Sequence, residues 1–366
     1  MGRVLFLANH FHTLHAFRKE MIQAMLEEGH DVYLSLPESS DNAFFEQKGC
    51  KVISTPIDRR GINPIKDLTL IWSYYKTIKQ VSPDIIFSFT VKPNIYGSYV
   101  SNRLHYKQVC NVTGTGATFL KDNWLSKLCR FLYKKTLAKC YKVFFQNTGD
   151  RDYFINYKMV GNNYELLPGS GCNLVEHSYK EMPFFDEIKF IFIGRVMRLK
   201  GVDEYLDCAF AVKKNYPNTK FYIAGWNEEN EYKAKVDKAE RDGVVEYVGF
   251  VKNINEWIEK CHCVILPSYG GEGVPNVLLE ASATGRVCIG SNIPGTRDVV
   301  DDGVTGFLFE PRNSGALIDV TMRFLSMSSD DMTTMGKKGR EKIENEFNRV
   351  IVVNKYLNEI NMVCSR

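Results

Sequence analysis

The sequence lacks an apolar run long enough to cross a membrane. A spanning helix needs about 20 consecutive apolar residues, and every hydrophobic segment is interrupted well before that length. The apolar segment 4–8 is also too short for the hydrophobic region of a signal peptide. We therefore interpret this segment as a strand and expect a cytoplasmic protein.

The sequence also lacks a surplus of one charge. Its 47 Lys and Arg residues nearly balance 43 Asp and Glu residues, which gives a net charge of +4. Nucleic-acid binding depends on a concentrated positive charge, so we expect no nucleic-acid partner. With 366 residues, of which 44% are hydrophobic, the chain has an ordinary globular composition and is long enough for two domains.

Cysteine is present but not in a pattern that predicts disulfides or a metal site. Ten cysteines are scattered through apolar segments, which is typical of reduced, buried thiols in a cytosolic protein. Cys261-His262-Cys263 has no partner pair elsewhere in the sequence. This short segment leads into an apolar strand, so we predict no metal there.

Short apolar strands alternate with amphipathic helices along most of the chain, which predicts an α/β fold with doubly wound parallel sheets. In the first half we expect strands at 4–8, 31–36, 52–53, 85–87, 108–112 and 142–145, and helices at 15–28, 68–80, 96–104 and 124–138. In the second half we expect strands at 190–193, 220–224, 245–248, 262–266, 287–290 and 305–308, and helices at 202–214, 229–240, 253–259, 276–283 and within 316–362.

The alternation breaks once, at 168–187, which we interpret as the connection between two Rossmann-like domains. The N-terminal domain is expected to span 1–170 and to be joined by a C-terminal helix at 347–366, and the C-terminal domain to span 171–346. Two such domains in one chain would face a central cleft, where ligands of open α/β sheets bind.

The most informative stretch runs from Leu266 to Gly285. A buried strand feeds a glycine-rich turn, Pro275 suits the first position of a helix, and Gly285 suits its end. Such a loop and helix N-terminus can bind an anion. Glu272 on the turn would repel that anion, so we infer that neutral groups such as sugar hydroxyls lie beside a phosphate.

A second loop carries fixed positive charge. Arg195 and Lys200 follow the predicted strand 190–193 and lie between Gly194 and Gly201. Two cations at the carboxyl end of a parallel strand fit a diphosphate. A solvated basic loop is the alternative, although the two glycines would let the backbone approach a ligand closely.

These segments together resemble the donor site of the retaining glycosyltransferases of family four. The resemblance is carried by Gly194-Arg195 with Lys200-Gly201, and by Glu272 followed eight residues later by Glu280, the E-x7-E pattern. The segments 292–295 and 301–306 also lie where such enzymes have similar motifs. The resemblance covers nearly the whole chain and implies the GT-B fold.

The resemblance implies a role for each matching residue. Arg195 and Lys200 would hold the diphosphate of a nucleotide sugar and stabilise the leaving group, Glu280 would accept hydrogen bonds from the ribose, and Glu272 would lie against the transferred sugar. Phe250 and Val251 would enclose the base, with an ordinary strand end as the alternative. The family generally needs no metal, and we expect no cofactor. The implied donor-binding residues are Gly194, Arg195, Lys200, Phe250, Val251, Gly273, Val274, Pro275, Asn276 and Glu280.

The N-terminal half would supply the acceptor side. His10, His12 and His15 cluster after the first strand, where one of them would accept a proton from an acceptor hydroxyl or all would simply cap and pack locally. Many relatives have a histidine where this sequence has Val91. Beside it, Lys92 would meet an anionic group, and Asn94 belongs to the same segment.

A glycine-rich segment at 111–119 also follows a predicted strand. Gly114 and Gly116 resemble part of a dinucleotide fingerprint, but Phe119 replaces the third glycine and no ribose-binding acid follows. We therefore expect no nicotinamide cofactor, and we interpret Thr113 and Gly114 as lining the acceptor side.

A basic amphipathic helix is predicted at 124–139. Leucines form one face, and Lys127, Arg130, Lys134, Lys135 and Lys139 form another. Such a helix suits the surface of an anionic membrane, and a core helix with a solvated basic face is the alternative. Acceptors in the resembled family are often lipid-linked, which favours peripheral contact with the inner face of the cell membrane.

The resemblance thus implies a retaining glycosyltransferase that moves a sugar from a nucleotide donor, expected to be UDP-linked, onto an acceptor hydroxyl. The acceptor would be a polyprenyl-diphosphate-linked saccharide in bacterial surface polysaccharide assembly. Two alternatives remain from other classes: a GT-B sugar-nucleotide epimerase and a non-catalytic nucleotide-sugar binding protein.

Overall fold

The computed structural model describes residues 1–59, 61–114, 119 and 122–365. The chain forms two compact units. Unit 1 contains Met1–Ser170 and Val350–Arg366, and unit 2 contains Gly171–Arg349. Each unit is built around one parallel sheet, which confirms the predicted fold class.

The sheet of unit 1 has seven parallel strands in the order β3-β2-β1-β4-β5-β6-β7. In chain order these strands are β1 (Arg3–Leu7), β2 (Asp31–Leu36), β3 (Lys51–Ser54), β4 (Ile85–Phe89), β5 (Lys107–Val112), β6 (Lys142–Phe145) and β7 (Tyr164–Leu166). The order reverses between β1 and β4, whose pairing includes Leu7 opposite Ser88. This reversal is the topological switch point of the sheet.

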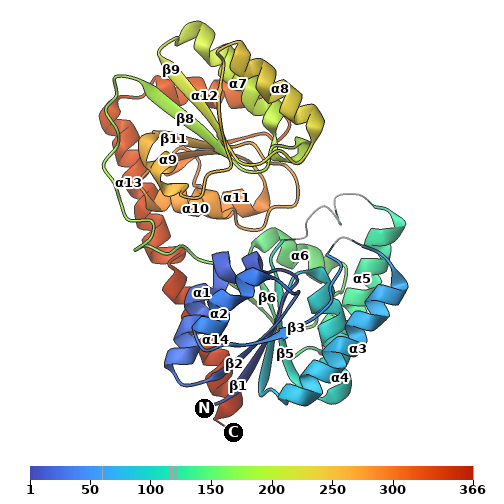
Figure 1. The fold of residues 1–366 in the computed structure, drawn as a ribbon. Helices are drawn as coiled ribbons and strands as arrows, with labels where there is room; N and C mark the ends of the chain where they lie inside the picture. Colours follow the sequence, from blue (N-terminus) through green and yellow to red (C-terminus); the bar gives the residue numbers. More distant parts are fainter. Residues whose placement is uncertain (60, 115–118, 120–121, 366) are drawn as a thin grey trace. The chain divides into compact units, whose positions relative to one another are not determined.

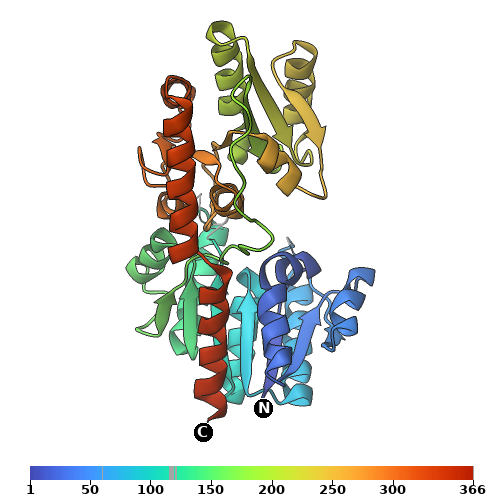
Figure 2. The same ribbon diagram turned by 90° about the vertical axis from the view of Figure 1, so that its left-hand side faces the viewer.

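Helices cover both faces of this sheet (Figure 1). On one face, α1 (Phe11–Glu27), α2 (Ala43–Gln47) and α14 (Arg349–Cys364) share a core with the strands. On the other face lie α3 (Pro64–Val81), α4 (Ser98–Leu104), α5 (Trp124–Thr136) and α6 (Thr148–Asn156). Figure 2 shows α14 running along the strands of unit 1, with both chain ends at the same end of that unit.

The sheet of unit 2 has six parallel strands in the order β10-β9-β8-β11-β12-β13. They are β8 (Ile188–Ile193), β9 (Thr219–Ala224), β10 (Glu246–Gly249), β11 (Cys263–Leu266), β12 (Val287–Ser291) and β13 (Gly306–Phe309). The helices are α7 (Val202–Asn215), α8 (Asn230–Arg241), α9 (Asn255–Lys260), α10 (Asn276–Ala283), α11 (Pro294–Val299), α12 (Ser314–Leu325) and α13 (Ser329–Glu346).

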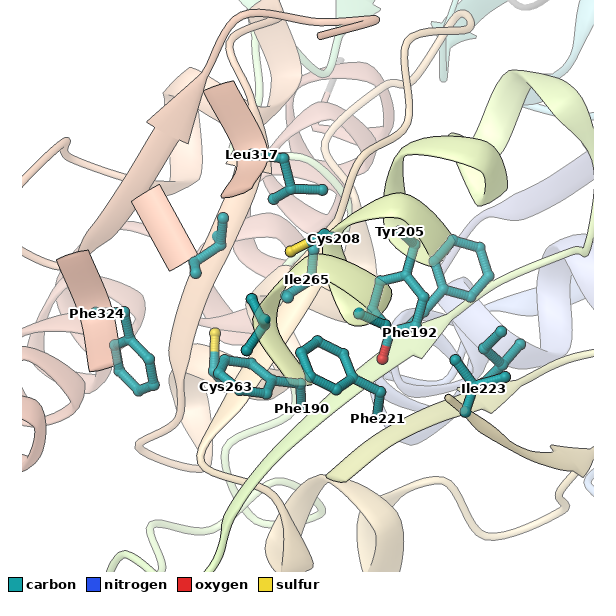
Figure 3. Close-up of a cluster of buried hydrophobic side chains, with 14 of the residues drawn as sticks. Phe190, Phe192, Tyr205, Cys208, Phe221, Ile223, Cys263, Ile265, Leu317 and Phe324 are labelled. Carbon is teal, nitrogen blue, oxygen red and sulfur yellow. The ribbon is translucent and has the colours of Figure 1, made fainter. Parts of the chain in front are cut away.

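Burial of aromatic residues organises the core of unit 2 on the face covered by α7, α8 and α12. Figure 3 shows this cluster, in which Phe190 and Phe221 stack with their ring centroids 4.7 Å apart. Tyr205 of α7 packs on Phe192 at 5.5 Å and donates a hydrogen bond to the carbonyl of Tyr222. These contacts fix the carboxyl ends of β8 and β9 under the loops that follow them.

The predicted start of the helix at 15–28 is wrong, because α1 already begins at Phe11. His10 Nδ1 accepts a hydrogen bond from the backbone N–H of His12 and so caps the helix. The predicted helix at 68–80 also begins earlier, because α3 starts at Pro64 after the capping residue Asn63. The helix α6 was not predicted from the sequence.

No helix in the described ranges combines the length and the apolarity needed to cross a bilayer.

Candidate active site

Four adjacent strands of unit 2 end at one edge of the sheet, and their following loops form the candidate donor site. Gly194 and Arg195 follow β8, Trp226 lies beyond β9, and Phe250 follows β10. The order of strands reverses between β8 and β11, and ligands of open α/β sheets bind at such a reversal. A pocket of about 350 Å³ lies here, lined by Ile193, Gly194, Arg195, Lys200, Ala224, Gly225, Trp226, Phe250, Val251 and Ile254.

Two exposed aromatic rings form one wall of this pocket. Trp226 is 48% exposed and Phe250 is 64% exposed, and their ring centroids lie 5.6 Å apart. Exposed rings beside an apolar pocket provide a stacking surface for a planar base. The sequence prediction included Phe250 but missed Trp226, whose only signal was an aromatic residue two positions after a predicted strand.

Gly225 allows the two loops beside the pocket to approach each other. It has φ +145°, and a Cβ at this position would lie only 1.8 Å from the carbonyl oxygen of Gly194. A side chain would therefore push apart the loops that hold Arg195 and Trp226.

The two predicted cations lie beside the pocket, and each has an acidic partner. Arg195 lies 3.6 Å from a carboxylate oxygen of Glu228. Lys200 forms an ion pair with Glu272 of the loop after β11. The structure thus brings together two predicted residues that are 72 positions apart in the sequence.

Ser268 fixes the position of Glu272. Its hydroxyl lies 2.5 Å from Glu272 Oε1 and 3.3 Å from the carbonyl oxygen of Leu199. Ser268 is buried, so it links the loop of Lys200 to the loop of Glu272. Sequence reasoning missed Ser268, because a lone serine after a strand belongs to no recognisable motif.

The loop before α10 is held by close backbone packing. Pro275 occupies the N-cap of α10 and Asn276 is its first residue, so the helix has the predicted bounds of 276–283, although Pro275 is its cap and not its first residue. A Cβ on Gly295 would lie 1.6 Å from the carbonyl oxygen of Gly273. The backbone N–H groups at this helix start are therefore presented by a loop with little room to move.

Glu280 lies within α10, as predicted, in a poorly solvated environment. Burial raises the pKa of its carboxyl to about 7, while Arg349 lowers this pKa and Glu176 raises it. A carboxylate held with little solvation gains from hydroxyl donors supplied by a ligand. This property is compatible with the implied ribose contact.

In unit 1, His10 and His12 lie at the switch point between β1 and β4. Burial, and then the charge of Arg59, lowers the pKa of both imidazoles; in addition the charge of His12 lowers the pKa of His10, whereas Asp41 raises it. The neutral form that can accept a proton is thereby favoured. His15 instead packs between Phe11 and Phe44, with centroid distances of 4.9 and 4.6 Å.

The segment after β4 has mainly internal partners. Lys92 Nζ lies 2.6 Å from Asp67 Oδ1, and the hydroxyl of Tyr96 donates to the other oxygen of the same carboxylate. Asn94 is buried and bridges the hydroxyl of Ser88 and the carbonyl of Asn111. Asn94 therefore fastens β4 to β5, a structural role that the sequence prediction did not include.

Thr90, which sequence reasoning missed, lies between β4 and Lys92 in a strained conformation. Its φ is +73°, and its buried hydroxyl has no hydrogen-bond partner within the described ranges. A β-branched residue rarely adopts this conformation, and such strain gathers at functional sites. The sequence contains no signal for it.

Thr113 and Gly114 follow β5 on the same edge of the unit 1 sheet, and Gly114 has φ +130°. Residues 115–118 of the predicted glycine-rich loop, Gly116 among them, lie outside the described residues.

Comparisons with known proteins define the class of this protein. Residues 3–147 match the family model described as glycosyl transferase 4-like, and residues 178–342 match the model described as glycosyl transferases group 1. One similar solved structure is a glycosyltransferase from Rickettsia africae, with a TM-score of 0.82 and 15% identity, covering 99% of this chain and 98% of that one. Another is HepE from Anabaena in complex with UDP and glucose, with a TM-score of 0.80 and 16% identity, covering 98% of this chain and 99% of that one. The fold is therefore the GT-B fold of glycosyltransferases.

Curated relatives agree with this class over most of the chain. One is an N,N'-diacetylbacillosaminyl-diphospho-undecaprenol alpha-1,3-N-acetylgalactosaminyltransferase from Campylobacter jejuni, 25% identical, with 85% of this chain and 86% of that protein covered. Another is a UDP-Gal:alpha-D-GlcNAc-diphosphoundecaprenol alpha-1,3-galactosyltransferase from Escherichia coli, 26% identical, with 89% and 87% covered. The chain is a glycosyltransferase and belongs to family four. Its N-terminal domain matches the glycosyl transferase 4-like model, and its C-terminal domain matches the glycosyl transferases group 1 model.

Proposed function

We propose that this enzyme transfers a sugar from a UDP-sugar to a hydroxyl of a polyprenyl-diphosphate-linked saccharide, with retention of the anomeric configuration, in the assembly of a bacterial surface polysaccharide. The observation that carries the donor half of this proposal is the contact between Lys200 and Glu272 beside an aromatic-walled pocket. The acceptor half is supported by the two curated relatives, whose names specify undecaprenol-diphosphate-linked saccharides.

The donor would bind with its base against Trp226 and Phe250 and its ribose near Glu280. Its diphosphate would lie between Arg195, Lys200 and the N–H groups that precede α10. When the diphosphate approaches, Lys200 can exchange Glu272 for a phosphate oxygen. Glu272, still held by Ser268, would then accept hydrogen bonds from the transferred sugar.

The departing UDP accumulates negative charge, and fixed cations that meet this charge lower the barrier. We propose that Arg195 and Lys200 provide this stabilisation and that no metal ion is required. EDTA is accordingly expected to leave turnover unchanged. A complete loss of turnover in EDTA that Mg²⁺ restores would contradict this part of the proposal.

The test of the function is incubation of the protein with UDP-sugars in the presence and absence of a polyprenyl-diphosphate-linked saccharide. Release of UDP that depends on the acceptor, with an α-linked product from an α-linked donor by NMR, is the expected result. Isomerisation of the donor without acceptor would identify an epimerase, and saturable binding without either reaction would identify a binding protein.

We propose a cytoplasmic location at the inner face of the membrane, with α5 in contact with lipid. The structure exposes Trp124, Leu128 and Phe131 of this helix, which recur at helical spacing, together with Lys127 and Lys135. An exposed stripe that is both apolar and basic supports an interfacial role.

A further inference from the structure

A second exposed apolar stripe lies on α3 of unit 1, on the side opposite its buried face. The buried side chains include Leu70, Tyr74 and Ile78, and the exposed stripe consists of Ile65, Leu68, Trp72 and Tyr75. The two stripes are offset by two residues, which corresponds to about 200° around a helix. Because one stripe is enough to pack α3 on its sheet, the outer stripe needs another explanation.

The outer stripe of α3 and the neighbouring helix α4 form one groove of about 410 Å³. Its lining residues are Leu68, Ile71, Trp72, Tyr75, Tyr99, Val100 and Arg103. Trp72 is 57% exposed and Leu68 is 65% exposed, so the groove opens directly to solvent. We call this surface the α3–α4 groove.

Cations lie on the aromatic rings of the α3–α4 groove. Lys76 Nζ is 3.2 Å from the ring centroid of Trp72, Lys79 Nζ is 5.2 Å from that of Tyr75, and the guanidinium of Arg103 is 5.0 Å from that of Tyr99. Each of these exposed rings thus has a positively charged side chain over it. Aromatic rings paired with cations are typical of surfaces that lie at the interface of an anionic bilayer.

Three of the four helices on this face carry mainly positive charge, whereas the fourth, α6, contains one Arg and two Asp residues. The helices α3, α4 and α5, which lie side by side in Figure 1, contain eight Lys or Arg residues and one acid, Asp67. That acid pairs with Lys92. The helices α1, α2 and α14 on the other face contain four basic and four acidic residues. Positive charge is therefore concentrated on the face that also exposes the aromatic rings.

We propose that the α3–α4 groove is a membrane-docking surface that inserts Trp72 and Tyr75 at the headgroup level of an anionic bilayer, next to α5. A second copy of this chain fits the groove poorly. In a symmetric dimer the same patch meets itself, so Lys76, Lys79 and Arg103 would face the same cations. An anionic bilayer offers both an apolar layer for the rings and negative charge for the cations.

The test is co-sedimentation of the full chain with vesicles of phosphatidylglycerol and phosphatidylcholine, compared with phosphatidylcholine alone. We expect binding only to the anionic vesicles. Replacing both lysines (Lys76→Gln with Lys79→Gln) should weaken binding roughly thirtyfold, because each lysine near an anionic surface contributes about 1 kcal/mol. Replacing both rings (Trp72→Ser with Tyr75→Ser) should weaken it at least as much.

A matched control is available in unit 2, where Phe210 is exposed on α7 with Lys214 6.0 Å from its ring centroid. Phe210→Ser should leave vesicle binding unchanged, and UDP affinity should be the same in all variants, which reports intact folding. Absence of vesicle binding by the wild type, or unchanged binding by both groove variants, would overturn the proposal. So would a wild-type dimer that the ring variant converts to a monomer, because the groove would then be a subunit interface.

This inference rests on the proposed function only for its purpose, which is access to a lipid-linked acceptor. Vesicle binding is measured without donor or acceptor. It can therefore fail while acceptor-dependent UDP release stands, and it can hold if that reaction fails.

Discussion

At the scale of single residues, Glu272 is the group whose chemistry is most open to test. Its carboxylate is paired with Lys200 and lies 2.5 Å from Ser268 Oγ. Glu272→Gln keeps the shape but removes the charge, so turnover should fall about a hundredfold or more, as when a transition-state contact is lost, while the melting temperature changes little. Acceptor-dependent UDP release and thermal unfolding measure the two effects.

The control for this substitution is Glu341→Gln, at an exposed position of α13, which should preserve turnover. A folded Glu272→Gln protein with nearly wild-type turnover would contradict the role assigned to this carboxylate.

Glu280 gives a second residue-scale prediction, through the pH dependence of stability. Burial raises the folded-state pKa of Glu280 from 4.5 to about 7. The folded protein therefore binds this proton more tightly than the unfolded chain does. The resulting stabilisation is complete below pH 4.5 and is lost as the pH rises to 7. Glu280→Gln lacks this dependence.

The melting temperature of Glu280→Gln relative to the wild type should therefore rise between pH 5 and pH 8, by on the order of 2–4 °C. Differential scanning fluorimetry across this range measures it. A constant difference at every pH would show that the environment of Glu280 does not favour its protonated form. The same variant should bind UDP about tenfold more weakly, since a charged hydrogen-bond acceptor is lost.

At the scale of elements, the loop before α10 depends on the contact between two glycines. A Cβ on Gly295 of α11 would overlap the carbonyl of Gly273, so Gly295→Ala must displace the donor loop. We expect a loss of about 1–3 kcal/mol of stability, as in other overpacked sites, and weaker UDP binding. Calorimetric titration with UDP and chemical denaturation measure both changes.

Gly339→Ala is the matched helical control. A Cβ at Gly339 would find its nearest atom 3.6 Å away, which is an ordinary contact, so UDP affinity should not change and stability should rise slightly. If Gly295→Ala bound UDP as tightly as Gly339→Ala does, the close packing of the loop would have no part in donor binding.

Much of the fold follows from the sequence because buried parallel strands read as short apolar runs between amphipathic helices. Motif spacing next to such strands also indicates the candidate donor residues Arg195, Lys200, Glu272 and Glu280. Ser268 and Trp226 could not be predicted in this way, because their importance arises from the side-by-side order of β8, β9 and β11. The start of α1 was missed because histidine is an uncommon N-cap residue.

Prediction from the sequence was similarly limited for the helices α3 and α5. The basic pattern of α5 was readable from the sequence. The outer stripe of α3 was not, because Leu68, Trp72 and Tyr75 look like core residues until Leu70 and Tyr74 are seen to be the buried ones. A helix with two apolar stripes cannot be told from a fully buried helix by periodicity alone.

At the scale of the whole molecule, the chain ends by returning to unit 1. Tyr356 of α14 is fully buried and packs on Phe87 and Phe144, with centroid distances of 5.1 and 5.3 Å. Its hydroxyl bonds to Asn111. All the proposed donor-binding residues belong instead to unit 2. A substitution at Tyr356 should therefore separate UDP binding from acceptor-dependent transfer.

Tyr356→Ala should destabilise unit 1 by about 3–5 kcal/mol, the usual cost of emptying a large aromatic site, whereas Tyr356→Phe should cost only about 1 kcal/mol for the lost hydrogen bond. UDP binding should survive in both variants, because unit 2 has its own core. Acceptor-dependent transfer should fall in the alanine variant alone. Limited proteolysis of the alanine variant should then cleave unit 1 before unit 2. If UDP binding and the structure of unit 1 were instead lost together, at the same unfolding midpoint, the two units would unfold as one.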